Sequence, residues 1–256
     1  HPDVLLMTAT PIPRTLALTV FGGLDVSTLD EMPPGRRPVA SRWYPPEKLR
    51  DAHEFIRARV AAGEQAFVVY PLVEDSETLD LKAATTSALQ LQREVFPEFR
   101  IGLLHGRMKP DEKERVMVEF RAGRYHILVS TIVIEVGIDV PNSTIMVIEH
   151  AERYGLAQLH QLRGRVGRGE KPSFFLLFAE PKNDDARRRL DVICSTTDGF
   201  KIAEEDLRMR GPGEFFGTRQ HGLPELRHAD ILRDFRLLQL ARRDAFDRVA
   251  RDARLA

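Results

Sequence analysis

The sequence predicts an α/β fold, in which a parallel β-sheet is covered by helices on both faces. Short apolar runs that begin at Ala66, Ile101, His126, Thr144 and Ser173 have the length and composition of buried strands. Helix-like segments separate these runs along the chain. Continuous apolar strands that alternate with helices are typical of a parallel sheet buried on both faces.

Each predicted element has a local reason. Strands are assigned to short apolar runs, and helices to segments whose apolar residues recur every three or four positions. Pro110 favours a helix start, and Gly63 favours a helix end. Buried strands are expected at 4–7, 66–70, 101–105, 126–130, 144–149 and 173–178. Helices are expected at 14–20, through Leu49, His53, Ile56 and Val60, and at 79–95, 110–121, 183–193, 200–210 and 231–249.

Composition excludes several classes of protein. No apolar run approaches the ~20 residues that a membrane-spanning helix needs, so no such helix is expected. The only cysteine, Cys194, can form neither a disulfide within the chain nor a cysteine-rich metal site, and a reducing cytoplasmic setting is expected. No metal site is expected, because His105 has no partner at a usable spacing. The net charge of zero decides nothing about nucleic acid.

The segment QLHQLRGRVGRG, residues 158–169, carries the clearest chemical signal. It places Arg165 and Arg168 three positions apart beside glycines, after the expected beginning of a helix. Guanidinium groups in this arrangement suit the charge that develops on a phosphate during transfer, although two solvated surface arginines are the alternative. Ligands of parallel sheets bind beyond the carboxyl ends of the strands, so both arginines are expected there, together with Thr131, Gly137 and Asp139.

Two absent motifs limit what the chain can do alone. There is no phosphate-binding loop of the form GxxxxGK[ST], so these residues are not expected to hydrolyse ATP by themselves. No GxGxxG turn follows a predicted strand, which argues against a nicotinamide-binding domain.

Several motifs together resemble the superfamily-two helicases. MTATPIPRTLAL resembles their third motif, HILVSTIVIEVGIDVP their fifth and QLHQLRGRVGRG their sixth, while LLHGRMKPDEKERVM resembles the segment after their fourth. The spelling is most similar to the bacterial DNA branch-migration helicases of this superfamily. The tail DGFKIAEEDLRMRGPGEFFGTRQHGLPE resembles the helical hairpin and loop that couple such a motor to DNA.

This resemblance implies a division into three parts. Residues 1–33 would be the terminal piece of a first helicase lobe, which ends at the Pro-rich turn. Residues 34–181 would be a RecA-like second lobe of the P-loop NTPase type that lacks the P-loop itself. Residues 182–256 would be a helical coupling hairpin, a loop and a C-terminal helix. The chain is expected to begin inside a longer protein.

The resemblance also assigns nucleotide contacts. Arg168 would be the arginine finger on the γ-phosphate of ATP, with Arg165 beside it. Gly137 and Asp139 match nucleotide-contacting positions, although a structural turn aspartate is the alternative for Asp139. The Mg²⁺ and most of the ATP would be held by the first lobe.

Further positions would contact DNA or transmit motion. Thr131 and Glu135, and likewise His105 and Gly106, follow strands and could hold a DNA phosphate. Coupling positions, some of which could instead be local caps or ordinary ion pairs, are Thr8, Thr10, Arg189, Arg210 and Gln220.

The expected function is that of a motor fragment of an ATP-dependent helicase that translocates on double-stranded DNA. It would remodel replication forks and Holliday junctions in recombination and repair, in the bacterial cytoplasm near the nucleoid and as a monomer. The alternatives are the motor lobe of a transcription–repair coupling factor and a non-catalytic DNA-binding lobe.

Overall fold

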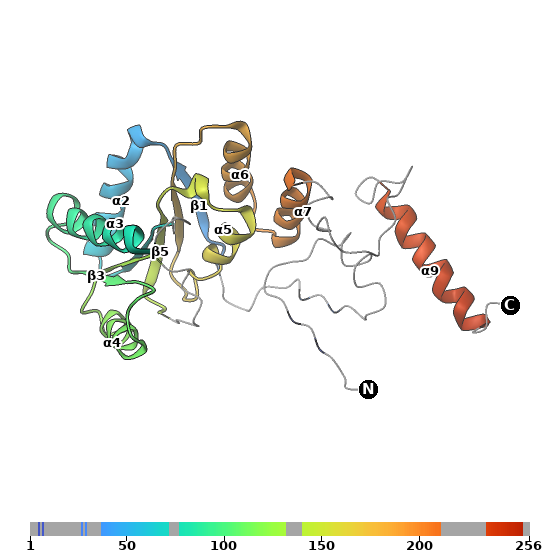
Figure 1. The fold of residues 1–256 in the computed structure, drawn as a ribbon, viewed down its shortest axis with the longest axis horizontal. Helices are drawn as coiled ribbons and strands as arrows, with labels where there is room; N and C mark the ends of the chain where they lie inside the picture. Colours follow the sequence, from blue (N-terminus) through green and yellow to red (C-terminus); the bar gives the residue numbers. More distant parts are fainter. Residues whose placement is uncertain are drawn as a thin grey trace. The chain divides into compact units, whose positions relative to one another are not determined.

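The computed structural model describes residues 37–71, 77–131, 140–210 and 234–252, and the single residues 5, 7, 27 and 29. The chain divides into two compact units, Glu31–Ile202 and a second that consists of His1–Asp30 and Ala203–Ala256. The first unit contains the sheet and most of the described residues (Figure 1).

The sheet has six strands, and each neighbouring pair is parallel. Its order is β1-β6-β5-β2-β4-β3. The strands are β1 (Ala40–Tyr44), β2 (Gln65–Val69), β3 (Ile101–Leu104), β4 (Ile127–Ser130), β5 (Ser143–Ile148) and β6 (Phe174–Phe178). The predicted parallel sheet is therefore confirmed, and five of its strands lie where apolar runs indicated them.

Strand β1 was not predicted from the sequence. It reads ASRWY, and of its residues only Tyr44 is buried. It lies at the edge of the sheet, where it pairs with β6 alone. An edge strand needs no continuous apolar run, so the pattern that reveals a central strand is missing.

Helices connect the strands and follow the predicted positions closely. They are α2 (Leu49–Ala61), α3 (Glu77–Gln90) with the π-helical continuation η2 (Leu91–Val95), α4 (Pro110–Arg121), α5 (Leu156–Arg163), α6 (Asp184–Ser195), α7 (Gly199–Arg210) and α9 (Phe235–Arg251). Short 3-10 turns, η1 (Pro46–Lys48) and η3 (Ala151–Arg153), precede α2 and α5. The predicted break between the two helices after β6 is confirmed, since α6 ends at Ser195 and α7 begins at Gly199.

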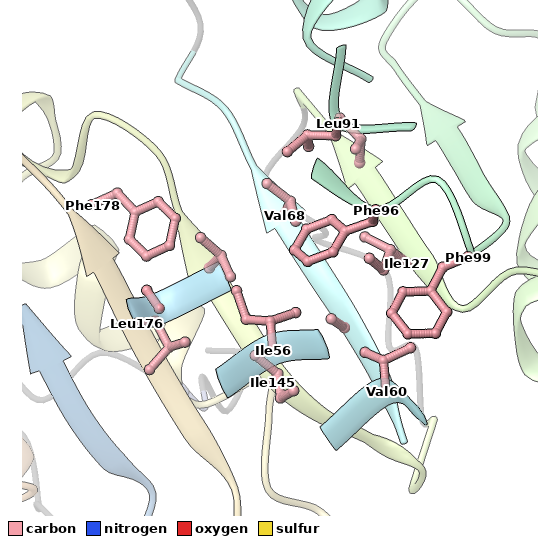
Figure 2. Packing of buried hydrophobic residues seen from close by; sticks show 14 of the residues in the cluster. Ile56, Val60, Val68, Leu91, Phe96, Phe99, Ile127, Ile145, Leu176 and Phe178 are labelled. Atoms are coloured by element: carbon pink, nitrogen blue, oxygen red, sulfur yellow. The ribbon is translucent and has the colours of Figure 1, made fainter. Parts of the chain in front are cut away.

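Both faces of the sheet are packed. On one face, Ile56 and Val60 of α2 and Phe96 after η2 join alternate residues of the strands, such as Val68 and Ile127, in one buried cluster (Figure 2). The intervening residue Phe67 faces the other side, where its ring lies 4.9 Å from that of Phe120 in α4. Alternate residues of β2 thus pack into the core on one face of the sheet and into the core on the other, as expected for a parallel sheet with helices on both faces.

One expectation about the first residues of the chain needs revision. Leu5 and Met7, the described residues of the predicted strand at 4–7, have no regular structure and are each 81% exposed. The first compact unit extends to Ile202 and includes α6.

Because all six strands run in the same direction, they all end on one side of the sheet and begin on the opposite side. The side where the strands end is called the carboxyl edge, and the side where they begin is called the amino edge. At the carboxyl edge, Thr131 N donates to Leu104 O at 3.3 Å and Glu149 N donates to Val69 O at 2.9 Å. At the amino edge, Ala40 N donates to Ser173 O at 2.9 Å. Each helix that connects two strands carries the chain from the carboxyl edge back to the amino edge. Each site residue can therefore be assigned to an edge from its place in the chain.

Replacing Phe120 by Ala is expected to lower the free energy of unfolding by about 3–5 kcal/mol, because it removes a fully buried ring and leaves a cavity beside Phe67. Val118→Ala, at a position in the same helix that is 47% exposed, is the control and should change stability by no more than about 0.5 kcal/mol. Equal losses in chemical denaturation would show that α4 does not cover the sheet as described.

Candidate functional site

The arginine-containing segment forms a loop at the amino edge of the sheet. Helix α5 ends at Arg163, so Arg165 and Arg168 follow the end of the helix and lead into β6. The expectation that they lie beyond the carboxyl ends of the strands is wrong. Strands β5 and β6 are parallel, so the helix between them must return the chain to the amino edge before β6 begins.

Two glycines hold this loop against the sheet. Gly167 has φ +76°, and a Cβ atom there would lie 2.8 Å from Val39 Cγ2, just before β1. A Cβ atom on Gly169 would lie 2.9 Å from the carbonyl oxygen of Pro141, just before β5. Only glycine fits such close approaches without displacing its neighbours. Arg168 is thus fixed between two points of contact with the amino edge.

The two arginines project from an anchored backbone. Val166, which lies between them in the sequence, is 1% exposed and secures the turn. Arg165 is half-buried and Arg168 is exposed. Within the described ranges, neither guanidinium group has a hydrogen-bond or ion-pair partner. Two cations with unused donors, held 3 positions apart on a fixed loop, form an arrangement suited to an anion such as a phosphate.

The segment that would contribute Gly137 and Asp139 lies outside the described residues. Its described neighbour is Val140, whose carbonyl accepts a hydrogen bond from Ser143 N at 2.9 Å. The next residue, Pro141, contacts Gly169. The chain that follows Asp139 therefore meets the arginine loop, which agrees with a shared site but does not test the roles of Gly137 and Asp139.

A second group of predicted residues lies at the carboxyl edge, after β3 and β4. Gly106 is exposed, with open space where a Cβ would be. The Nδ1 atom of His105 is buried and has no partner among the described residues. Burial and the charge of Lys113 lower the pKa of His105. Thr131 is only 5% exposed and its N–H bonds to Leu104 O, so neither its side chain nor its amide is open to DNA in this conformation.

The remaining predicted site residues are only partly described. Arg189 lies in α6, where its Nη2 atom donates to the carbonyl of Glu152 at 3.0 Å. Arg210 is the last residue of α7, and the structure describes its backbone but not its side chain. Thr8, Thr10, Glu135 and Gln220 lie outside the described residues.

Sequence reasoning missed an acidic group at the carboxyl edge. Glu149 directly follows β5, and burial, with a smaller contribution from the charge of Glu152, raises its pKa from 4.5 to about 7. Burial and the charge of Glu149 likewise raise the pKa of Tyr70 and of Tyr154 above the usual tyrosine value. An acid immediately after a continuous apolar strand is the sequence signal that could have indicated a buried carboxyl group.

Sequence reasoning also missed Arg163, the first arginine of the same motif. It is 4% exposed, and its Nη1 atom donates to the carbonyls of Ile193 and Thr196, each at 2.7 Å. The signal was present as a third arginine within six residues, but sequence spacing alone does not distinguish a buried arginine from an exposed one.

Neither a metal-binding cluster nor a membrane-spanning helix is found among the described residues. They contain no group of three or more His, Cys, Asp or Glu side chains that could hold a metal ion. They also contain no helix long and apolar enough to cross a membrane.

Two segments of the chain match models of known protein families. Residues 47–170 match the family model of the helicase conserved C-terminal domain. Residues 196–256 match the model described as ATP-dependent DNA helicase RecG, domain 3, C-terminal. The first match contains the arginine loop, and the second begins at the end of α6.

Individual relatives are similar over almost the whole chain. The ATP-dependent DNA helicase RecG of Thermotoga maritima is 55% identical over 242 residues, which are 94% of this chain and 31% of that protein. Its counterpart in Bacillus subtilis (strain 168) is 50% identical over 252 residues, 98% of this chain and 37% of that protein. The structure of RecG bound to a three-way DNA junction is 51% identical, with a TM-score of 0.69, and the match covers 90% of this chain and 30% of that one. The chain thus spans about a third of the length of these relatives.

The parallel sheet and the arginine loop at its amino edge define a RecA-like C-terminal lobe of a helicase. The matches before and after α6 make the assignment more specific: the chain belongs to the RecG family of ATP-dependent DNA helicases.

Gly167→Ala is expected to destabilise the protein by about 1–3 kcal/mol, because it combines a left-handed φ with a steric clash against Val39. Gly123→Ala is the matched control, since Gly123 has φ +71° but open space around the position of a Cβ. The control should lose only about 1 kcal/mol, the cost of backbone strain. Equal losses in thermal unfolding would mean that the loop is not held against Val39.

Glu149→Gln is expected to stabilise the protein at pH 8 by up to about 3 kcal/mol. The pKa of Glu149 is about 7 in the folded protein, whereas its ordinary value is 4.5. The wild type therefore loses stability as the pH rises from 4.5 to about 7, because Glu149 then ionises in its buried position. Glutamine has no such charge, so its advantage should grow across that range and disappear below it. Denaturation curves at pH 4, 6 and 8 measure this, with exposed Glu54→Gln as the control; an advantage that does not change with pH would contradict the assignment.

Proposed function

We propose that the protein to which this chain belongs is an ATP-dependent translocase on double-stranded DNA that remodels replication forks and Holliday junctions. In it, the chain contributes the second motor lobe and the helices that follow. Membership of the RecG family supports this proposal, as does the similarity to a RecG protein solved on a three-way DNA junction. The observation that carries it is the arginine loop, in which Arg165 and Arg168 have unpaired guanidinium groups among the described residues.

The proposed chemistry assigns to the loop the role of a cation that acts across a cleft between lobes. Arg168, fixed between Gly167 and Gly169, would reach the γ-phosphate of an ATP molecule held by another lobe, with Arg165 beside it. Charge that develops on the phosphoryl group in the transition state would then be stabilised by donors that are already in place. The anchored backbone supports this role, because it keeps the cation in place during the chemical step itself, which is separate from the binding and release of the nucleotide.

Magnesium is proposed to accompany ATP and to neutralise phosphate charge. The described residues contain no group of three or more His, Cys, Asp or Glu side chains that could hold a metal ion. We therefore assign no step of the metal's chemistry to this part of the chain, and propose that the other lobe binds Mg²⁺. Gly137 and Asp139 remain proposed nucleotide contacts, supported by the contact between the following Pro141 and Gly169.

DNA is proposed to bind at the opposite edge of the sheet. Gly106 is exposed there, and the nearby Nδ1 atom of His105 is without a partner among the described residues. Thr131 would contribute only if the segment after it moved, because its own amide and side chain are occupied or buried. Glu135 is proposed to act with this group on the basis of sequence alone.

Because ATP and DNA would occupy opposite edges, the motor requires residues that couple them. Arg189, Arg210, Gln220, Thr8 and Thr10 are proposed for this role. The contact from Arg189 to Glu152 O supports it, since it joins α6 to the turn that follows β5.

We further propose a monomer that works in the bacterial cytoplasm, close to the nucleoid. The match of residues 196–256 to a RecG model favours this reading over the transcription–repair coupling factor.

Arg168→Ala in the full-length protein is expected to lower kcat of the DNA-stimulated ATPase by about 10³–10⁵, the usual effect of losing an arginine finger. Arg50→Ala, in α2, is the control, since its side chain is 88% exposed and forms an exposed ion pair with Glu54. DNA binding should be retained in both variants. An undiminished ATPase rate in Arg168→Ala would instead favour a non-catalytic DNA-binding lobe.

A further inference from the structure

Arg163 is a buried charge that the proposed catalytic roles do not use. It is the last residue of α5 and lies two positions before Arg165, yet it is only 4% exposed. Burying an unpaired guanidinium group is very unfavourable, so its partners must compensate for the lost water. Burial lowers the pKa of Arg163, but an arginine remains charged at neutral pH.

Two partners of Arg163 lie at the end of α6. Its Nη1 atom donates to Ile193 O and to Thr196 O, each at 2.7 Å, and lies 3.4 Å from Ser41 Oγ in β1. Carbonyls at the end of a helix have no partners within the helix and attract a cation. Arg163 therefore satisfies two such carbonyls and fixes the end of α6 beside the arginine loop.

A chain of hydrogen bonds continues from Thr196 to the next helix. Thr196 Oγ1 accepts from Asp198 N at 3.1 Å. Asp198 Oδ1 in turn accepts from Phe200 N at 2.9 Å and from Lys201 N at 3.4 Å, which makes Asp198 the N-terminal cap of α7. The residues from Arg163 to Lys201 belong to one compact unit. The arginine loop is thus connected to the first turn of α7 through two residues, Thr196 and Asp198.

From this connection we infer that Arg163 is a positioning residue that transmits displacement of the arginine loop to the start of α7, the helix that precedes the proposed coupling loop. The inference rests on the proposed function, which it deepens. When Arg165 and Arg168 engage or release a phosphate, the end of α5 shifts, and Arg163 carries α6 and the cap of α7 with it. Arg163 itself does not touch nucleotide.

The first test measures the link directly, by hydrogen exchange in the full-length protein. Arg163→Gln should speed exchange of the amides of residues 199–202 by about tenfold or more, the factor that corresponds to losing one charge-assisted hydrogen bond. Arg163→Lys, which retains a charge and donors, should show a smaller increase, and peptides from α2 should be unchanged. Unchanged exchange at residues 199–202 in Arg163→Gln would overturn the inference.

The second test separates coupling from catalysis. In Arg163→Gln, fork unwinding per ATP hydrolysed should fall by about tenfold, while kcat of the ATPase stays within about twofold. Asp198→Ala, which cuts the same link further along, should behave alike. Its matched control is Asn183→Ala, because Asn183 caps α6 through a bond from Ala186 N at 2.8 Å and lies outside the link. The control should retain normal unwinding per ATP.

The outcomes are distinct. A parallel fall of ATPase and unwinding in Arg163→Gln, or an equal loss of unwinding per ATP in Asn183→Ala, would overturn the inference. If Arg163→Gln does not fold, Asp198→Ala and Thr196→Val decide the question by the same ratio. A wild-type protein without DNA-stimulated ATPase would refute the proposed function, whereas the hydrogen-exchange result would still confirm or reject the link.

Discussion

The parallel alignment of the six strands is the constraint on which the arrangement of the site depends. In a parallel sheet each connecting helix must carry the chain back from the carboxyl edge to the amino edge. The residues that follow strands, such as His105 and Glu149, are therefore separated from those that follow helices, such as Arg165 and Arg168. A protein that uses both groups has to transmit information through the lobe rather than within one pocket.

Three arginines of one motif are used in two different ways because their surroundings differ. Arg165 and Arg168 extend from a loop that Gly167 and Gly169 hold against the sheet, and their guanidinium groups stay available among the described residues. Arg163 lies in the last turn of α5, where Ile193 of α6 and Thr196, just after that helix, each supply a carbonyl oxygen at 2.7 Å. Backbone close packing thus presents two of the charges, while burial converts the third into a connection between helices.

Much of the fold could be predicted because the central strands and the helices have strong periodic patterns. The strands β2 to β6, and helices such as α2 and α4, lie within a few residues of their predicted positions. Strand β1 was missed because an edge strand with one buried residue has no apolar run. The predicted buried strand at 4–7 is wrong at its two described residues, Leu5 and Met7, which are exposed and have no regular structure.

The sequence by itself determined the alternation of strands and helices, the parallel sheet and the presence of two closely spaced arginines whose chemistry suits phosphate, since these depend on local patterns and residue chemistry. Only the tertiary structure decided which edge the arginines occupy, that Arg163 is buried against α6 and that Glu149 ionises near neutral pH. These properties depend on which segments distant in sequence surround a side chain. Solvent exclusion and hydrogen bonding by those neighbours, which residue spacing does not specify, set the role of each charge.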